Sequence, residues 1–423
     1  MAAGDARKRE VQMMKTIALV GTFDSKGKEF LYAKTLIEKL GLKTYTIHAG
    51  TFDPLFEPDI TNEEVAQAGG MPLADVVDSG DRGLAADVMA KGVAKIVPEL
   101  YQEGRYDGIL SFGGSGGTTL ATAGMRELPV GVPKVMVSTM ASGNVSEYVG
   151  TSDIVMMPSL VDVAGLNSII RTVIRNAVMA VAGMVGYADS LSEEAGDAAD
   201  AKPAIAATMF GVTTPCVSYA KELLEKAGYQ VIVFHANGAG GKMMEKLIDQ
   251  GVFAGVLDLT TTEVCDDLFG GVLTAGPHRC EAAIRQKLPQ VVSVGADEMI
   301  NFGHVSTLPQ QYADRNIHIH NPANTLMRMT AEESAILGRR LAEKWNTAQT
   351  EMTVLLPLGG MSMLDAPDRP FDGPEERKVL YSAIKEGITN PKVHVRELSY
   401  NINDQAFAET AVNELLHLIK VSS

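Results

Sequence analysis

A glycine-rich stretch in the first half of the chain has the residue types that bind phosphate. Its members are Gly113, Gly114, Ser115, Gly116, Gly117 and Thr118. Glycines let backbone N–H groups approach an anion, and the N-terminus of a following helix adds a partial positive charge. The alternative is a tight strand-to-helix turn, but the glycine content exceeds what a plain turn requires. The pattern therefore favours phosphate binding.

The type of phosphate loop is harder to assign. The stretch lacks the lysine of a Walker A loop and the full spacing of a Rossmann dinucleotide loop. Its letters, GGSGGTTL, are closer to the GGDGT-type loops of phosphofructokinase-like and NAD kinases, with Ser115 at the position of their aspartate. The missing carboxylate weakens any inference of phosphoryl transfer. No nucleophile is identifiable, so whether the protein is an enzyme stays open.

Two other segments follow strand-like runs and could complete the same pocket. One contains Gly21, Thr22, Asp24 and Lys26; the lysine could neutralise a phosphate, and the aspartate could orient a ribose, a lysine or Mg²⁺. Equally, this segment could cap a helix. The other contains hydroxyl groups that could instead satisfy their own loop. Its candidates are Ser138, Thr139 and Ser142.

Polar residues also end strand-like runs in the second half of the chain. His318 and His320 alternate along one run, which could place them on one strand face beside a metal, although a polar strand face is the commoner arrangement. We therefore expect no metal held by the protein alone, with Asp24 the possible Mg²⁺ contact. Candidates for a second, small-molecule site are Glu263, Asn301, His320 and Arg328.

The elements that would position these residues alternate between strands and helices. In the first half, strands are expected at 16–20, 43–48, 106–112, 135–138 and 154–157, and helices at 27–40, 84–101, 118–126 and 163–187. Strands are expected in the second half at 253–257, 291–294, 316–319, 352–356 and 393–396. This alternation predicts an α/β fold with mostly parallel, doubly wound sheets.

A repeat divides the chain into two similar parts. Tyr32, Gly41 and His48 recur with the same spacing as Tyr219, Gly228 and His235, which indicates a duplicated βαβ opening. The acidic, small-residue stretch 189–202 reads as a linker. We therefore expect a Rossmann-like nucleotide-binding subdomain over 14–188 and a second Rossmann-like subdomain over 203–423.

The composition of the chain indicates which classes of partner and which cellular compartment to expect. The net charge of −15 and the absence of basic clusters argue against nucleic acid. The short polar N-terminus lacks the pattern of a signal peptide, and no uninterrupted apolar run reaches the roughly 18 residues of a membrane helix. Three cysteines without metal-type spacing suit a reducing compartment. The expectation is a soluble, cytoplasmic protein.

The ordered motifs resemble those of one family, the ATP-binding domain of the tomato mosaic virus resistance protein and its bacterial and fungal relatives. The similar segments include 21–26, 113–120, 133–143, 275–277, 301–303, 320–322, 326–328 and 356–358. This resemblance implies two Rossmann-like subdomains, ATP in the first of them and a homodimer. Two functions would fit this resemblance, an ATP-dependent, kinase-like enzyme acting on a small molecule or an ATP-stabilised regulatory module.

Overall fold

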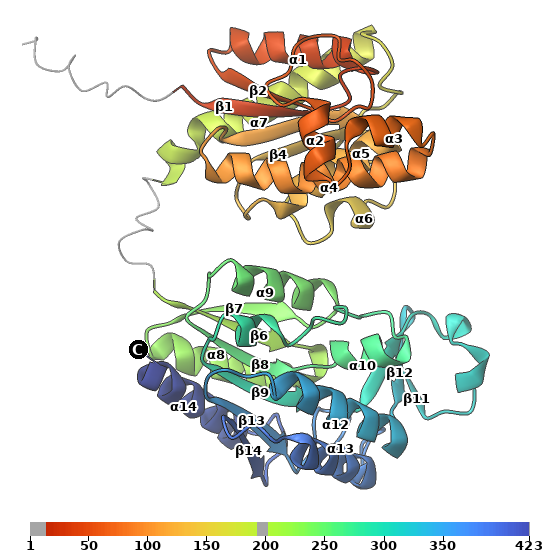
Figure 1. Cartoon of the computed structure of the whole chain (residues 1–423). Helices are drawn as coiled ribbons and strands as arrows, with labels where there is room; N and C mark the ends of the chain where they lie inside the picture. The colour runs from red at the N-terminus through yellow and green to blue at the C-terminus, as the bar shows by residue number, and fades with distance from the viewer. Residues whose placement is uncertain (1–13, 193–201, 423) are drawn as a thin grey trace, which may run out of the picture. The chain divides into compact units, whose positions relative to one another are not determined.

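The chain divides into two compact units, one within residues 1–199 and the other within residues 200–423 (Figure 1). The computed structural model describes residues 14–192 and 202–422. The expected linker over 189–202 overlaps a helix that continues to Ser192, and residues 193–201 lie outside the described part.

The first unit is built on a parallel sheet of five strands in the order β2-β1-β3-β4-β5. The chain reverses its direction of progress between β1 and β3, and ligands of such sheets bind at the carboxyl ends of the strands beside this switch. The strands are β1 Thr16–Gly21, β2 Lys43–His48, β3 Gly108–Gly113, β4 Lys134–Ser138 and β5 Val155–Pro158.

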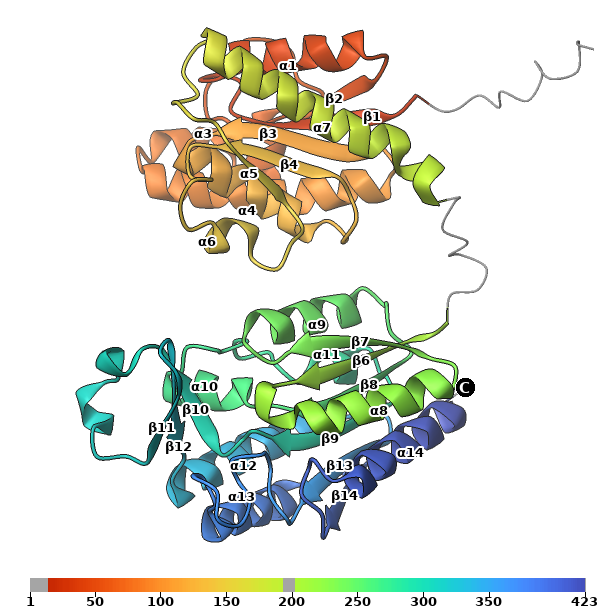
Figure 2. The ribbon, with the colours of Figure 1, turned by 180° about the vertical axis from the view of Figure 1, so that it is seen from behind.

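Helices cover both faces of this sheet. Successive side chains of its central strands point to opposite faces, and both sets are buried. Ile17 and Leu19 of β1 pack under α1 and α7, whereas Ala18 and Val20 pack under α2, α4 and α5. Figure 2 shows α1 and α7 on one face of the sheet and α4 and α5 on the other. The helices are α1 Gly27–Lys39, α2 Asn62–Ala68, α3 Leu73–Asp78, α4 Arg82–Gln102, α5 Ser115–Glu127, α6 Ser146–Val149 and α7 Ser168–Ser192.

Two helix starts differ from the sequence expectation. Helix α5 begins at Ser115 rather than at residue 118, so two of the glycines belong to its first turn. Helix α7 begins at Ser168 rather than at residue 163, because the Asn167 side chain accepts the Ile170 N–H and its carbonyl accepts the Arg171 N–H. Apolar periodicity alone could not locate these capping contacts.

Helix α7 is the longest helix of the first unit and is rich in apolar residues. Its segment Ser168–Ala188 has a mean hydropathy of 1.4 and, by length and composition alone, could cross a membrane. Arg171 and Arg175 interrupt the apolar run of this segment without lowering its mean hydropathy below that value. In the fold, Ile170, Val173, Ala177 and Val181 form a buried stripe against the first sheet, which is the pattern of a core helix.

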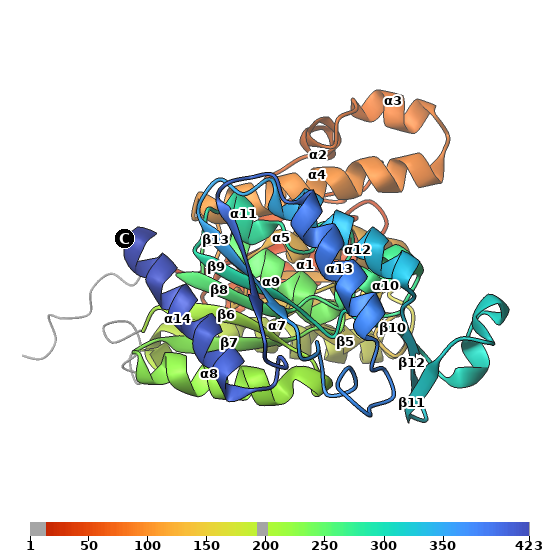
Figure 3. The same cartoon turned by 90° about the horizontal axis from the view of Figure 1, so that it is seen from below.

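The second unit has a larger parallel sheet in the order β14-β13-β9-β8-β6-β7. A small antiparallel sheet, β10-β12-β11, extends away from it (Figure 3). The expected strand at 316–319 belongs to this small sheet, not to the parallel one. The strands are β6 Ala204–Met209, β7 Gln230–His235, β8 Gly255–Thr260, β9 Gln290–Gly295, β10 Met299–Phe302, β11 Ile317–Asn321, β12 Asn324–Arg328, β13 Met352–Pro357 and β14 Val393–Leu398.

The helices of the second unit again cover both faces. Helices α8 and α14 pack with β6, β8 and β13 on one face, and α9, α11, α12 and α13 contribute to the clusters on the other. Their bounds are α8 Thr214–Lys226, α9 Ala239–Asp249, α10 Glu263–Phe269, α11 Ala282–Arg285, α12 Ala331–Trp345, α13 Pro374–Gly387 and α14 Gln405–Ser422. Three 3₁₀ turns occur at Gly211–Thr213, Val305–Thr307 and Gln310–Tyr312.

The two units share local geometry at their repeated openings. In both sheets the first strand lies between the second and the third. At the ends of these strands, Phe23 stacks on His48 with 5.3 Å between ring centroids, and Phe210 stacks on His235 with 5.4 Å. The interplanar angles, 19° and 20°, are equally similar. A duplication accounts for both the sequence repeat and the matching ring pairs.

Candidate functional site

A cavity of about 730 Å³ lies in the first unit beside the switch between β1 and β3. Of the predicted site residues, Thr22, Asp24 and Gly116 line it. Most of the remaining wall comes from the loop after β2, from α3 and from α4. The other lining residues are Ser25, Ala49, Gly50, Thr51, Phe52, Asp53, Val76, Val77, Gly80, Asp81, Arg82, Ala85, Ala86, Met89 and Leu120.

The N-terminus of α5 reaches this cavity at Gly116. Its cap residue is Gly114, and among the described residues no side chain caps the helix and no acidic residue occupies its first turn. The Thr118 N–H bonds the Gly114 carbonyl at 2.9 Å, so the N–H groups of Ser115, Gly116 and Gly117 come before the first intrahelical bond. Together with the helix dipole, these N–H groups make an anion-binding end.

The glycines at the N-terminus of α5 differ in how much room their surroundings leave for a side chain. A Cβ on Gly113 would lie 2.9 Å from the Gly117 Cα, so the fold itself requires Gly113. A Cβ on Gly116 would meet nothing within 4 Å, and one on Gly114 or Gly117 would make only ordinary contacts at 3.8 and 3.7 Å. Glycine inside a helix costs about 0.5–1 kcal/mol relative to alanine. Contacts within the protein therefore do not explain why residues 116 and 117 are glycine.

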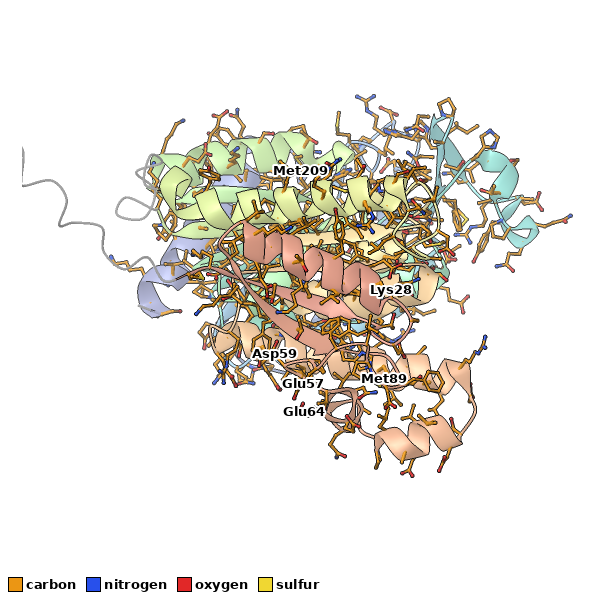
Figure 4. All side chains as sticks on the ribbon, turned by 90° about the horizontal axis from the view of Figure 1, so that it is seen from above. Lys28, Glu57, Asp59, Glu64, Met89 and Met209 are labelled. Atoms are coloured by element: carbon orange, nitrogen blue, oxygen red, sulfur yellow. The ribbon has the colours of Figure 1, made fainter. Side chains whose placement is uncertain are left out.

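The loop after β1 holds its aspartate at the cavity and turns its lysine away. The Asp24 carboxylate accepts the backbone N–H groups of Ser25 at 2.6 Å and Phe52 at 3.1 Å. Lys26 does not line the cavity, because its ammonium donates to the Val163 carbonyl. Lys28 is exposed on α1, where Figure 4 labels it, as expected of a solvated lysine.

Two glycines keep this loop compact. A Cβ on Gly21 would lie 2.2 Å from the Phe30 ring, so Gly21 is needed for packing and does not line the cavity. A Cβ on Gly50 would lie 2.4 Å from the Asp24 carboxylate, so Gly50 lets the loop after β2 approach the aspartate.

The third predicted segment supports α5 from behind and lies outside the cavity lining. The buried Ser138 hydroxyl lies 2.6 Å from the Thr118 hydroxyl and accepts the Met140 N–H. Thr118 also donates to the Gly114 carbonyl at 2.7 Å. Thr139 and Ser142 are exposed. Ser138 and Thr118 therefore position the start of α5.

Sequence reasoning missed the walls supplied by residues 49–89. Phe52 is 68% exposed, yet its carbonyl accepts from His48 Nε2 at 2.9 Å and from Asn62 Nδ2 at 3.2 Å. Arg82 is the only basic residue among the described residues that line the cavity. Met89 lies where α4 packs against α2 (Figure 4). A signal was present in Asp81, a helix-capping residue directly before Arg82.

The four predicted second-site residues lie in three different environments. Asn301 and His320 line a cavity of about 320 Å³ in the second unit. Arg328 does not; its guanidinium donates to the carbonyls of Phe371 at 2.9 Å and Glu298 at 3.1 Å. The structure therefore does not bring all four into one cavity, because Arg328 and Glu263 make internal contacts.

Glu263 belongs to a buried ion-pair network around Arg279. Arg279 Nε donates to Glu263 at 2.7 Å, and Arg279 Nη1 and Nη2 donate to Asp258 at 2.5 and 2.7 Å. Burial disfavours the charged guanidinium, but the attraction of Asp258 outweighs it and raises the pKa of Arg279. The Glu263 carboxylate also accepts the N–H groups of Gly238 at 2.6 Å and Gly241 at 3.1 Å, at the N-terminus of α9.

A metal site does not emerge in the described part of the chain. Among the residues that the structure describes, no group of three or more His, Cys, Asp or Glu side chains could hold a metal ion. His318 and His320 lie on β11, the edge strand of the antiparallel sheet. The three cysteines are buried with free thiols.

The fold and its cavities define a two-unit α/β protein with a parallel sheet in each unit and a ligand-sized cavity at the strand ends of each. Residues 15–190 match the N-terminal domain, and residues 202–419 the C-terminal domain, of the Uncharacterised protein family (UPF0261). The chain belongs to the UPF0261 family.

Its relatives include bacterial and plant proteins. A UPF0261 protein of Clostridium tetani is 47% identical over 410 residues, covering 96% of this chain and 100% of the relative. The ToMV resistance protein Tm-1 of Solanum lycopersicum is 43% identical over 339 residues, which is 80% of this chain and 45% of the tomato protein. These identities confirm the resemblance to the tomato protein's family.

The similarity to solved structures is low. The structure of UDP-N-acetylglucosamine 2-epimerase from Rickettsia bellii has a TM-score of 0.24 and 12% identity, covering 66% of this chain and 78% of that chain. Similarity at this level carries no argument about function.

Proposed function

We propose that this protein binds ATP in the cavity of the first unit, with the phosphates at the N-terminus of α5. The observation that carries the proposal is the pair Gly116 and Gly117, whose missing side chains have no explanation in the protein's own packing. Phosphate oxygens would accept the N–H groups that precede the first intrahelical bond of α5. The volume of about 730 Å³ suits a nucleotide, since ligand pockets commonly span about 300–1,000 Å³.

The chemistry of the walls suits the other parts of ATP. Val76, Val77, Ala85, Ala86 and Met89 form an apolar wall that would receive the adenine. The exposed ring of Phe52 offers a further aromatic surface for stacking. Arg82 would supply a cation for the phosphates, because the lysine of the β1 loop is engaged elsewhere.

Magnesium would arrive with the nucleotide. Mg²⁺ keeps several waters and is usually held by one or two carboxylates together with substrate phosphates. Asp24 lines the same cavity as Gly116, and its carboxylate accepts the backbone N–H groups of Ser25 and Phe52. We therefore propose Asp24 as the protein's contact to a nucleotide-bound Mg²⁺, directly or through water.

The test is a calorimetric and thermal-shift titration of the full chain with ATP, ADP, AMP and NAD, each with and without Mg²⁺. A ligand that binds only the folded protein raises its melting temperature by mass action. We expect saturable stabilisation by ATP, lost in Gly116→Arg, whose side chain would fill the phosphate position. An absence of stabilisation by every nucleotide would refute the proposal.

A second candidate, an ATP-dependent enzyme acting on a small molecule, is favoured by the separate cavity at Asn301 and His320. A kinase-like enzyme should turn over ATP only with its acceptor present. A regulatory module would instead show ATP-dependent self-association without turnover. The family resemblance also supports our proposal that the protein is a cytoplasmic homodimer. Light scattering with and without ATP tests the homodimer.

A further inference from the structure

The cavity of the second unit differs in chemistry from that of the first. Its volume is about 320 Å³, at the small end of ligand pockets, and its lining residues include no Asp, Glu, Lys or Arg. Amides and imidazoles supply its polar groups, from the end of β7, from β10 and from the β11–β12 hairpin. These residues are His235, Asn237, Asn301, His320, Asn321 and Asn324.

Asn301 is a buried amide with an unused acceptor. The residue is only 2% exposed, and its Nδ2 donates to Asp266 Oδ1 at 3.2 Å and Thr262 Oγ1 at 3.4 Å. The carboxylate fixes the amide with Nδ2 toward Asp266, so Oδ1 is the free end, and it has no hydrogen-bond partner among the described residues. A buried acceptor without a partner carries a desolvation penalty. A donor from a ligand would satisfy it.

His235 presents a second acceptor on an aromatic wall. Its Nδ1 lies 3.1 Å from the Met209 carbonyl, which places the ring proton on Nδ1 in the neutral form and leaves Nε2 as an acceptor. The ring stacks on Phe210, and Leu273 and Leu326 add apolar surface to the same cavity. The cavity therefore combines acceptors that need O–H or N–H donors with a flat apolar wall.

Anions are disfavoured here by the protein's own carboxylates. Glu263 already occupies the N-terminus of α9, where it accepts the N–H groups of Gly238 and Gly241. That carboxylate takes the place that a phosphate would need. Asp266 places another carboxylate directly behind Asn301. The described lining of the cavity therefore offers a negatively charged ligand no cation, and the N–H groups of Gly238 and Gly241 at the start of α9 are not free to bind it.

We propose that this cavity binds a neutral, polyhydroxylated small molecule, a monosaccharide or a cyclic polyol. Its hydroxyl groups would donate to Asn301 Oδ1 and His235 Nε2 and exchange hydrogen bonds with the surrounding amides. Its C–H face would lie on Phe210 and the two leucines. This site is separate from the nucleotide site and does not depend on it.

The test uses the full chain with D-glucose, D-xylose and myo-inositol as neutral probes, and D-glucose 6-phosphate and D-glucuronate as charged counterparts. Saturation-transfer NMR detects binding at millimolar affinity, and calorimetry quantifies it. We expect at least one neutral probe to bind saturably and its charged counterpart to bind at least tenfold more weakly. Binding by none of the neutral probes, or preference for the charged ones, would overturn the proposal.

Two variants locate the binding. Asn301→Leu removes the buried acceptor and should weaken binding roughly tenfold or more, because a ligand hydroxyl loses its partner in a desolvated site. His235→Phe keeps the aromatic stack, removes Nε2 and changes an exposed residue, so it tests the site even if Asn301→Leu fails to fold. Gly116→Arg, in the first unit, should leave sugar binding unchanged. Wild-type affinity in both second-unit variants would overturn the assignment.

Discussion

Replacing Gly116 by alanine separates the demands of the fold from those of the ligand. The added Cβ meets nothing within 4 Å, and the residue lies in the first turn of α5. Alanine is the better helix former by about 0.5–1 kcal/mol. The free variant should therefore be more stable than the wild type, with a rise in melting temperature of about 1–4 °C for a unit of this size.

The same methyl group should weaken ATP binding. It would stand where phosphate oxygens approach the N–H groups of α5, and the loss of one hydrogen bond to a charged group costs about 1.5–3 kcal/mol. The dissociation constant for ATP should rise roughly ten- to hundredfold. Opposite signs for stability and affinity are the signature of a glycine kept for its ligand.

The assay pairs thermal unfolding without ligand with calorimetric titration of ATP and Mg²⁺. Gly186→Ala is the matched control, because Gly186 is an exposed glycine of α7 whose Cβ would also meet nothing within 4 Å. The control should gain similar stability and keep wild-type affinity. If Gly116→Ala binds ATP as tightly as the wild type, the phosphate site is not at this helix end and our reasoning fails.

Three further outcomes follow from the buried charges and the cavity wall. Arg279→Met leaves Asp258 and Glu263 buried without their cation and should cost about 3–5 kcal/mol in urea unfolding; a loss below about 1 kcal/mol would contradict the network's role. Burial and the nearby Asp365 raise the pKa of Glu298 from the ordinary 4.5 to about 7. The free energy of unfolding that this group contributes below pH 4.5 is therefore lost as the pH rises through about 7. Glu298→Gln should flatten the pH dependence of the free energy of unfolding between pH 5 and 8. An unchanged slope would exclude Glu298 as its source. Arg82→Ala should weaken ATP more than adenosine in calorimetry, and equal losses would show that Arg82 does not contact the phosphates.

Local sequence signals located most elements of the sheets. Alternating buried residues and apolar runs mark the strands, because in a parallel sheet covered on both faces nearly every strand side chain is buried. Helix starts were less predictable. The start of α5 at Ser115 depends on cap geometry within a glycine run, where apolar periodicity is silent.

The walls of the first cavity illustrate a different limit. Residues 49–83 show no strong periodic pattern, and residues 84–89 are predicted only as the start of a helix. Together they bring Phe52, Arg82 and Met89 to the strand ends. Their positions follow from long-range bonds, such as Asp24 to the Phe52 N–H, that connect distant parts of the chain. Long-range contacts also remove a predicted ligand. The Lys26 ammonium, which could have bound a phosphate, instead donates to the carbonyl of Val163, more than a hundred positions away in sequence.

The amino-acid sequence by itself determined the α/β class, the repeated opening and the glycine-rich run between a strand and a helix, because each depends on residues that are close together in the chain. Only the tertiary structure decided which polar residues are available to a ligand. It enclosed Glu263 and Arg328 in internal contacts and left Asn301 with an unpaired acceptor in a cavity. Pairing of buried charges and amides is settled by contacts between distant segments, and no local pattern encodes it.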